Sequence, residues 1–510
     1  MADKRLKLSS KWIQWAGFIT AFLTGCLFAI VLLASSAGFV SNDDYYHSRI
    51  ASEIIEQRTL RVAFPWLPLT ILSPEKFVDH HLLYHVFLAP FSYWGGVGGA
   101  KVAQALIVGG IFAAVWMLLR RLEIRPAWLW LIAVLGVSAP FLYRMVMVRA
   151  QGAAVLMLLL ALYAFFSHRP RWLIPIAFAF TWLYNGFILL PIFAGLYLVS
   201  AWLTERRFVW QPLVYTLIGT AAGLIINPYF PQNIAFILDH LGEKVDIASN
   251  IRVGSEWYPY TTQALLENSP GALLALVGGM IAPSLRKTGR DRTETMLMLT
   301  AILTLYMAFE SRRFIEYAPI FALLFCAAAL GRMGRNTIQW DQLLPSFAAR
   351  FRFKWVYPLL LSLPVLVLIW HTMHTVQEDI QDAPDAEYMA GAAAWLQTNT
   401  PPNALIFQTD WDDFTYLFYH NTHNTYLVGL DPTYLQVADA TLWNLWVPIT
   451  QGMVERPSVL IRESFGAAYV VSDLNHEAFA SSAENDPNMQ LVYRDSYSLI
   501  WQVMEPQPEN

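Results

Sequence analysis

Long runs of apolar residues recur over the first three quarters of the chain, and short polar segments separate them. Runs that cross, or nearly cross, a hydrocarbon core of about 30 Å lie at 13–38, 101–119, 126–142, 150–166, 172–184, 187–203, 211–226, 264–284, 295–309, 314–331 and 355–371. The pair 172–184 and 187–203 could form one tilted span, or a hairpin broken around Tyr184-Asn185-Gly186. The pattern therefore predicts about eleven transmembrane helices, with ten to twelve allowed.

The pattern changes after the last apolar run. Shorter alternating segments predict a helix at 386–397, a strand at 404–408, a helix at 459–464 and strands at 467–472, 491–494 and 498–504. We therefore expect a transmembrane domain over 1–374 and a small α/β domain outside the membrane over 375–510.

The charge of the segments between the apolar runs gives an orientation. Alternate segments, at 1–12, 120–125, 167–171, 204–208, 285–294 and 332–354, together hold 20 Lys and Arg residues, against 11 in the longer segments of the other set. Basic residues favour the cytoplasmic side. The N-terminus is therefore expected inside and the C-terminal domain outside, so most titratable residues between spans face outward.

Composition agrees with the membrane class and narrows the partners. The chain is 56% hydrophobic and only 14% charged, and its net charge is −4. This balance gives no reason to expect a nucleic-acid partner. Cys26 and Cys326 both lie in apolar runs, which excludes a disulfide framework and a thiolate zinc site.

Two adjacent carboxylates follow the first apolar run, at the start of a long outer loop, 40–100. Asp43 and Asp44 begin a segment in which Tyr46, Ile50 and Ile54 would share one helical face. Either Asn42 or Asp43 could cap that helix. His47 lies three and four residues after the pair, so all three side chains would lie on neighbouring helical positions. A carboxylate here could act as a general base or bind a hard cation.

The same loop carries a second polar group, Asp79-His80-His81, with His85 four residues after His81. The i, i+4 spacing of two histidines can hold a metal ion, but zinc would need a further ligand. A helix start capped by Asp79, with histidines at the membrane interface, is the alternative.

Arginines mark two other outer junctions. Arg312 and Arg313 lie between two late spans, flanked by Glu310 and Glu316, and Arg144 and Arg149 lie between two earlier ones. Ion pairs with the neighbouring glutamates would explain the arginines structurally. Adjacent guanidinium groups are also suited to bind a phosphate or diphosphate.

These motifs together resemble the GT-C glycosyltransferases, in particular the catalytic subunit of oligosaccharyltransferases. The resemblance rests on an outer aspartate after the first span, Asp43, with Arg49 six residues later. Further matching segments are Asn227-Pro228-Tyr229, Arg312-Arg313-Phe314, Trp395-Leu396, Thr400-Pro401 and Asp410-Trp411-Asp412.

The resemblance implies a GT-C-like fold, a polyprenyl-phosphate or polyprenyl-diphosphate sugar donor and a transfer reaction at the outer face. Asp43, with Asp44 as its rival, matches the aspartate at the reaction centre. Arg312 or Arg313 would bind the donor phosphate, helped by Arg144 or Arg149, and His47, Asp79, His80, His81 and Glu316 are supporting or metal-binding candidates. The resemblance leaves a divalent cation, Mg²⁺ or Mn²⁺, as a candidate cofactor.

Two departures from the family pattern limit this expectation. The run from Asp410 to Phe414 lacks the tandem tryptophan of the acceptor-reading motif, and 144–152 contains no acidic residue where a carboxylate pair is expected. A role in which Asp43 or Asp44 orients or deprotonates an acceptor is therefore preferred to a metal site.

The leading hypothesis is a glycosyltransferase of a bacterial inner membrane whose site faces the periplasm, with a lipid, glycan or protein acceptor. A multispan transporter or lipid flippase is the alternative. It would show acidic groups deep in the spans and a repeat between halves, whereas the apolar runs are nearly free of acids.

Overall fold

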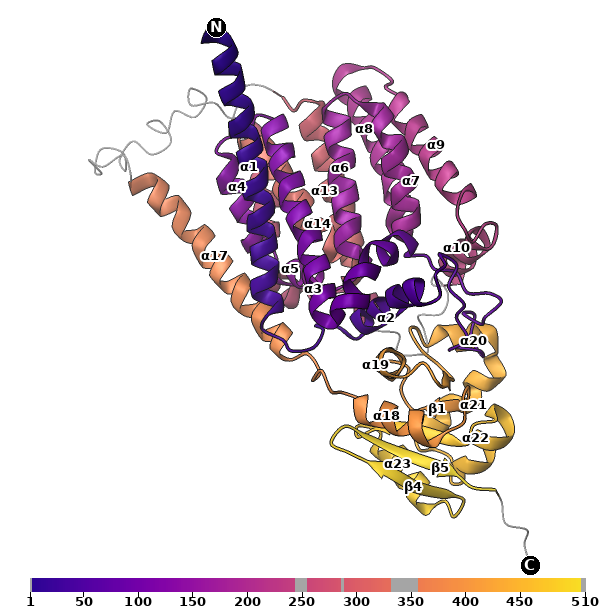
Figure 1. The fold of residues 1–510 in the computed structure, drawn as a ribbon. Helices are drawn as coiled ribbons and strands as arrows, with labels where there is room; N and C mark the ends of the chain where they lie inside the picture. Colours follow the sequence, from indigo (N-terminus) through magenta and orange to yellow (C-terminus); the bar gives the residue numbers. More distant parts are fainter. Residues whose placement is uncertain (1, 244–254, 286–288, 332–355, 506–510) are drawn as a thin grey trace, which may run out of the picture. The chain divides into compact units, whose positions relative to one another are not determined.

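The computed structural model describes residues 2–243, 255–285, 289–331 and 356–505, and the chain divides into two compact units (Figure 1). The helical unit comprises Met1–Ser36, Lys101–Ile226 and Ser255–Asp382. The sheet unit comprises Ala37–Ala100, Asn227–Gly254 and Ala383–Asn510. The long outer loop thus belongs to the same compact unit as the C-terminal segment.

The helical unit is built from apolar helices, and each apolar range expected from the sequence contains at least one of them. They are α1 (Ala2–Leu33), the second part of α3 (Leu82–Arg121), α4 (Ala127–Ala133), η1 (Val134–Gly136), α5 (Ala139–Val146), α6 (Ala150–Phe166), η2 (Pro170–Trp172), α7 (Leu173–Leu183), η3 (Asn185–Ile188), α8 (Leu189–Glu205), α9 (Gln211–Ile225), η4 (Ser255–Trp257), α11 (Thr262–Asn268), α12 (Pro270–Ile281), η5 (Ala282–Leu285), α13 (Arg292–Glu310), η6 (Arg312–Glu316), α14 (Ala318–Gly331) and α17 (Val356–Gln381).

Fewer helices than expected are long enough to cross a membrane. Among the described residues, three helices are long and apolar enough: Trp15–Leu33, Leu82–Arg121 and Asn185–Glu205. Two bent helix pairs raise this number to five if each pair forms one span. Ala150–Phe166 and Gln211–Ile225 are apolar but short. At a rise of about 1.5 Å per residue, the length of such a helix is less than the thickness of a hydrocarbon core of about 30 Å. The count of eleven and the orientation are not confirmed, and the basic segment 332–354 lies outside the described residues.

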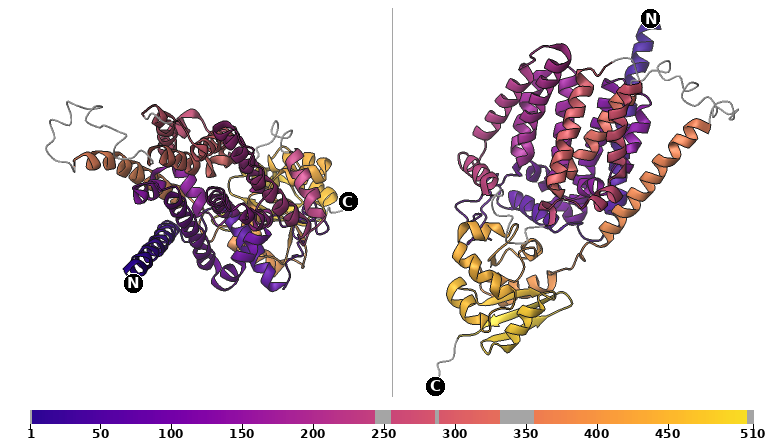
Figure 2. Two further views of the ribbon diagram at one scale, coloured as in Figure 1. Left: turned by 90° about the horizontal axis from the view of Figure 1, so that it is seen from above. Right: turned by 180° about the vertical axis from the view of Figure 1, so that it is seen from behind.

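Neighbouring helices in this unit pack closely through small residues. Helices α7 and α9 lie side by side, as do α13 and α14, which form the salmon-coloured pair in the rear view of Figure 2. A side chain at Gly219 of α9 would meet the backbone carbonyl of Ile174, and Trp182 donates a hydrogen bond from Nε1 to the carbonyl of Gly223 at 2.9 Å. The glycines therefore allow the two backbones to approach.

The expected break around Tyr184-Asn185-Gly186 is present. Helix α7 ends at Leu183, Tyr184 is extended, and η3 leads into α8. The two apolar runs on either side are thus separate helices.

The sheet unit holds a mixed sheet and the helices around it. Its elements are α2 (Asn42–Glu56), the start of α3, α10 (Gln232–Glu243), α18 (Ala390–Asn399), β1 (Leu405–Gln408), α19 (Asp413–His420), β2 (Thr425–Tyr426), α20 (Thr433–Ala438), α21 (Ala440–Thr450), α22 (Pro457–Phe465), β3 (Tyr469–Asp473), α23 (Glu477–Asn485), β4 (Met489–Arg494) and β5 (Ser498–Val503). Within the described residues, the strand order is β2-β1-β3-β5-β4. Strand β1 is parallel to β2 and β3, and β5 is antiparallel to β3 and β4.

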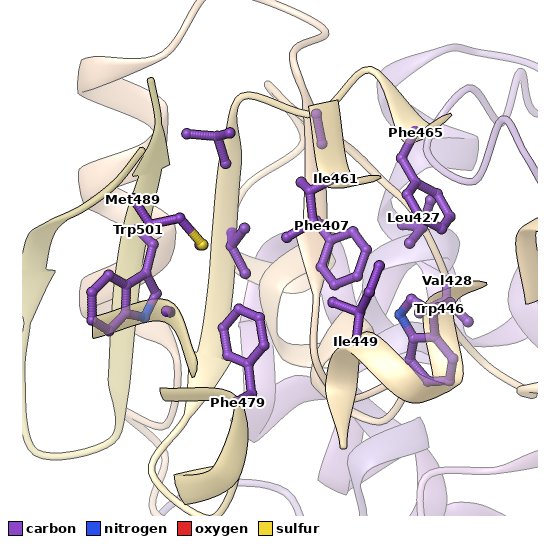
Figure 3. Packing of buried hydrophobic residues seen from close by; sticks show 14 of the residues in the cluster. Phe407, Leu427, Val428, Trp446, Ile449, Ile461, Phe465, Phe479, Met489 and Trp501 are labelled. Carbon is purple, nitrogen blue, oxygen red and sulfur yellow. The ribbon is translucent and has the colours of Figure 1, made fainter. Parts of the chain in front are cut away.

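One face of this sheet is covered by α21, α22 and α23. Alternate strand residues such as Phe407 and Trp501 point toward Trp446, Ile461 and Phe479 of these helices (Figure 3). This period of two is that of a strand with one face on a core. Helix α18 packs on the opposite face, where the ring of Trp395 lies 6.0 Å from that of Tyr469 and 6.3 Å from that of Tyr493.

The expected strands and helices of the C-terminal segment are present at nearly the expected positions. Strand β2 and helices α19, α20, α21 and α23 were not predicted. Strand β2 has only two residues, which are too few to show the alternation of apolar and polar positions that predicts a strand.

Candidate functional site

The carboxylate pair lies in the first turn of α2, which begins at Asn42. The N-cap residue is Ser41, and its side chain makes no capping hydrogen bond. Instead, the Asn42 side chain accepts from the N–H of Asp43 at 2.8 Å. Asp43 is half-buried and Asp44 is fully buried. Both carboxylates lie at the positive end of the helix macrodipole, which favours negative charge there.

Helix α19 packs against α2, so the segment after β1 lies beside the carboxylate pair. Asn42 donates from Nδ2 to Asp412 Oδ1 at 2.7 Å. Tyr45 contacts Tyr416 and Tyr419 of α19 at ring distances of 4.7 and 5.2 Å. The run from Asp410 to Phe414, noted for its partial likeness to an acceptor-reading motif, is therefore a neighbour of Asp43 and Asp44 within the sheet unit.

His47 faces two other histidines. Its Nδ1 lies 2.7 Å from Nε2 of His85, and its ring centre lies 4.9 Å from that of His81. The ligand atoms of His47, His81 and His85 all lie within 4.8 Å of one another, so these residues could hold a metal ion. The sequence supplied the pair His81 and His85 at the start of α3 but not the third ligand, which comes from α2.

The other residues of the histidine segment have separate roles. Asp79 accepts from the N–H of His81 at 2.9 Å and contacts Nδ1 of His85 through Oδ2 at 2.8 Å. It thus caps the chain entering α3, as expected, and also orients His85. His80 stacks on Phe236 of α10 at 5.2 Å.

In the helical unit, three arginines converge on Glu256. Its Oε2 lies 3.2 Å from Arg144 and 4.0 Å from Arg149, and its Oε1 lies 3.5 Å from Arg313. Glu316 is buried and pairs with Arg144 at 3.4 Å. The arginines come from α5, the start of α6 and η6, so they are far apart in the chain and adjacent in the fold.

Opposite charges set the pKa values within this arginine cluster. Burial alone would raise the pKa of Glu256, but Arg313, Arg149 and Arg144 outweigh it and hold the pKa of that carboxyl well below its usual value. Burial acts to lower the pKa of Arg313, and Tyr184, Glu256 and Glu316 together raise it above its usual value. Three guanidinium groups thus lie close to the carboxylates of Glu256 and Glu316.

The two candidate arginines of η6 point to different partners. Arg313 donates to Tyr184 Oη at 3.0 Å and lies 4.9 Å from the Trp257 ring. Arg312 donates from Nε to the carbonyl of Pro259 at 3.2 Å and lies 5.3 Å from the Tyr260 ring. Arg313 thus belongs to the arginine cluster. Arg313 pairs with Glu256 and Glu316 pairs with Arg144, so ion pairs are present, and binding of a phosphate stays a prediction.

A second group with metal-binding potential lies at the carboxyl ends of the parallel strands β1 and β3. It comprises Asp410, Asp473 and His476. Asp473 accepts a short hydrogen bond from His476. Burial and the nearby Asp410 and Asp473 carboxylates raise the pKa of Asp413 well above its usual value.

The Asp473–His476 pair should make stability depend on pH. Burial lowers the pKa of His476, but the bond to Asp473 outweighs it and raises the pKa above 6.5. Burial raises the pKa of Asp473, but His476 outweighs it and lowers the pKa below 3.8. The histidine contribution is complete below pH 6.5 and lost as pH rises through the raised value. The aspartate contribution is present above pH 3.8 and lost as pH falls through the lowered value.

Thermal unfolding of the full chain should therefore show the pair's contribution most fully between these limits. At pH 5.5, His476→Gln should lower the free energy of unfolding by about 1 kcal/mol, which is measured as a lower Tm. At pH 9 the same variant should change Tm much less. An equal loss at both pH values would contradict the ion pair.

The structure brings the sequence candidates together in two groups. Asp43, Asp44, His47, Asp79, His81 and His85 lie in the sheet unit, and Arg144, Arg149, Arg313 and Glu316 lie in the helical unit. Sequence reasoning missed Glu256 as a site residue. In the sequence, Glu256 is an acidic residue of a long outer loop. Neither its spacing nor its sequence neighbours link it to Arg144 and Arg149, which are more than 100 positions away.

Comparison with known proteins finds similarity in fold but not in sequence. No family model and no curated protein matches the chain. The oligosaccharyltransferase AglB from Archaeoglobus fulgidus, solved with an inhibitory peptide and a dolichol-phosphate, gives a TM-score of 0.63 at 16% identity over 97% of this chain and 75% of that one. The same enzyme tethered to an acceptor peptide with an NVT sequon gives 0.59 at 16% identity, over 96% and 74%.

A second neighbour is shorter and matches over nearly its whole length. ArnT from Cupriavidus metallidurans, bound to undecaprenyl phosphate, gives a TM-score of 0.56 at 18% identity over 96% of this chain and 99% of that one. Both neighbours are GT-C glycosyltransferases. The fold of this chain is therefore that of the GT-C glycosyltransferases, which its first-loop residues resemble.

Proposed function

We propose that the chain is a glycosyltransferase that moves a sugar from a polyprenyl-phosphate or polyprenyl-diphosphate donor to an acceptor at the outer face of a bacterial inner membrane. The arginine cluster is the observation that carries this proposal. Arg144, Arg149 and Arg313 converge on Glu256 from three separate elements. A phosphate group suits such a site, because guanidinium groups bind it bidentately.

The chemistry assigned to these residues is simple. The bond between the sugar and the donor phosphate breaks as the acceptor oxygen bonds to the sugar, and negative charge builds on the leaving phosphate. Arg313, with Arg144 and Arg149, would stabilise that charge. Asp43, or Asp44 beside it, would orient the acceptor hydroxyl and take its proton. Mg²⁺ or Mn²⁺ would find oxygen ligands at these carboxylates.

Two fold neighbours support a lipid-linked donor in general terms. The AglB structure is a complex with a dolichol-phosphate, and the ArnT structure has undecaprenyl phosphate bound. The acceptor is a separate question. Because the run from Asp410 to Phe414 lacks a tandem tryptophan, a lipid or glycan acceptor fits this chain better than an Asn-X-Ser/Thr peptide.

The test is transfer by the purified full chain in proteoliposomes. Labelled sugar on a polyprenyl-phosphate or -diphosphate is supplied with lipid, glycan or peptide acceptors, and the labelled product is separated. We expect donor-dependent product that is lost when the same sugar is supplied as a nucleotide conjugate. Uptake of the labelled lipid or solute with no sugar transferred would instead support a transporter or flippase.

A further inference from the structure

We infer that His47, His81 and His85 bind one transition-metal ion of the zinc class. These three side chains come from two separate segments of the sheet unit: His47 lies in α2, His81 directly precedes α3, and His85 lies in the first turn of α3. Each offers a ring nitrogen, and the three nitrogens lie within 4.8 Å of one another. One ion at their centre would reach all three with only small side-chain rotations, because zinc–nitrogen bonds are about 2.0–2.1 Å long.

The local backbone supports this arrangement. The N–H of His85 donates to the carbonyl of His81 at 2.9 Å, so the two residues lie one helical turn apart on the same face, at i and i+4. His47 meets them from the other helix, with its Nδ1 2.7 Å from Nε2 of His85. Two ligands from one helical turn and a third from a neighbouring element make a preformed set.

Asp79 supplies the outer contact that such ligands usually have. Its Oδ2 lies 2.8 Å from Nδ1 of His85. A carboxylate can only accept there, so Nδ1 carries the proton and Nε2 presents its lone pair toward His47. A carboxylate behind an imidazole orients the ring and raises its basicity as a metal ligand.

The type of donor selects the type of ion. Imidazole nitrogens suit zinc and its transition-metal neighbours, whereas Mg²⁺ prefers oxygen ligands. Three imidazoles leave the fourth tetrahedral position to another ligand. This ion is therefore distinct from the Mg²⁺ or Mn²⁺ expected from the family resemblance.

The surroundings exclude bulk water. His47 is 4% exposed and His85 is 0% exposed. The rings of Tyr84 and Tyr46 lie 5.7 Å from His47 and 6.1 Å from His85 respectively. An ion bound here would join α2 to the start of α3. Because His47 follows Asp43 by four residues, the ion would fix the helix turn that carries Asp43.

Metal content of the full chain tests the inference without reference to sugar transfer. The protein is purified with any histidine tag removed, stripped with a chelator, equilibrated with Zn²⁺ and desalted. We expect about one zinc per chain, a higher Tm with zinc than after stripping, and no change in either with excess Mg²⁺. Co²⁺ in place of Zn²⁺ should give the visible absorption of a low-coordinate nitrogen-ligated ion.

Neighbouring histidines provide matched variants. His81→Ala and His85→Ala should lose the bound zinc, whereas His80→Ala should keep it. Asp79→Asn, which changes a positioning residue, should weaken zinc binding by about 10- to 100-fold. Absence of bound zinc in the wild type would overturn the inference, as would full zinc occupancy in His81→Ala and His85→Ala. If those variants do not fold, the wild-type zinc and cobalt measurements still decide.

Discussion

Replacing Arg313 with glutamine is expected to lower sugar transfer from a polyprenyl-linked donor by about 100- to 1,000-fold, the usual loss when one charge-stabilising donor is removed from a transition state. Arg313 is the arginine of η6 that faces Glu256, at 3.5 Å, and it is held by Tyr184 at 3.0 Å. Its neighbour Arg312 faces the Pro259 carbonyl and Tyr260 instead. Arg312→Gln should therefore keep activity within a few-fold of wild type.

This pair of variants separates two explanations for the arginines. If Arg313 only balances Glu256, Arg313→Gln should reduce Tm and leave the kinetic constants of the folded fraction unchanged. If it binds the donor phosphate, kcat/KM for the donor should fall, and Arg313→Lys should restore part of it, since lysine keeps the charge without the bidentate geometry. A large loss in Arg312→Gln with normal transfer in Arg313→Gln would reverse the assignment.

The sequence predicted the apolar helices well because a continuous apolar run is a local signal. It could not predict how the polar residues group. Arg144 and Glu256 are more than 100 residues apart and meet only because their helices pack in one bundle. Likewise, His47 and His85 come together through the packing of α2 against the start of α3, and no spacing rule relates residues in two different helices.

The division of the chain shows the same limit. A change in composition after 374 suggested an outer domain of residues 375–510, with the loop 40–100 assigned to the transmembrane domain. In the fold, α2 packs on α19 through Tyr45 and Tyr416, and Trp66 donates from Nε1 to the carbonyl of Thr422 at 3.0 Å. Aromatic residues that are typical of a membrane interface serve here as the contact between the loop and the C-terminal segment.

Asp43→Asn is expected to lower kcat for transfer by about 100- to 10,000-fold, the range typical of a positioned general base, with little change in Tm. Asp43 is half-buried, so an acceptor hydroxyl can reach it, whereas Asp44 is fully buried. Asparagine keeps the shape of the side chain but cannot take a proton. Glu75→Gln, at an exposed position of the same loop, is the matched control and should transfer sugar normally.

Asp44→Asn should behave differently, because its carboxylate is fully buried and lies near enough to Tyr45 and Tyr416 to help raise their pKa values. We expect a smaller loss in kcat, about 10-fold, of the size seen when a group positions a reacting residue, together with a lower Tm. The reverse order of the two variants would place the base at Asp44. Wild-type activity in both would remove the carboxylate pair from the reaction, and the first-loop resemblance would then describe the fold without its chemistry.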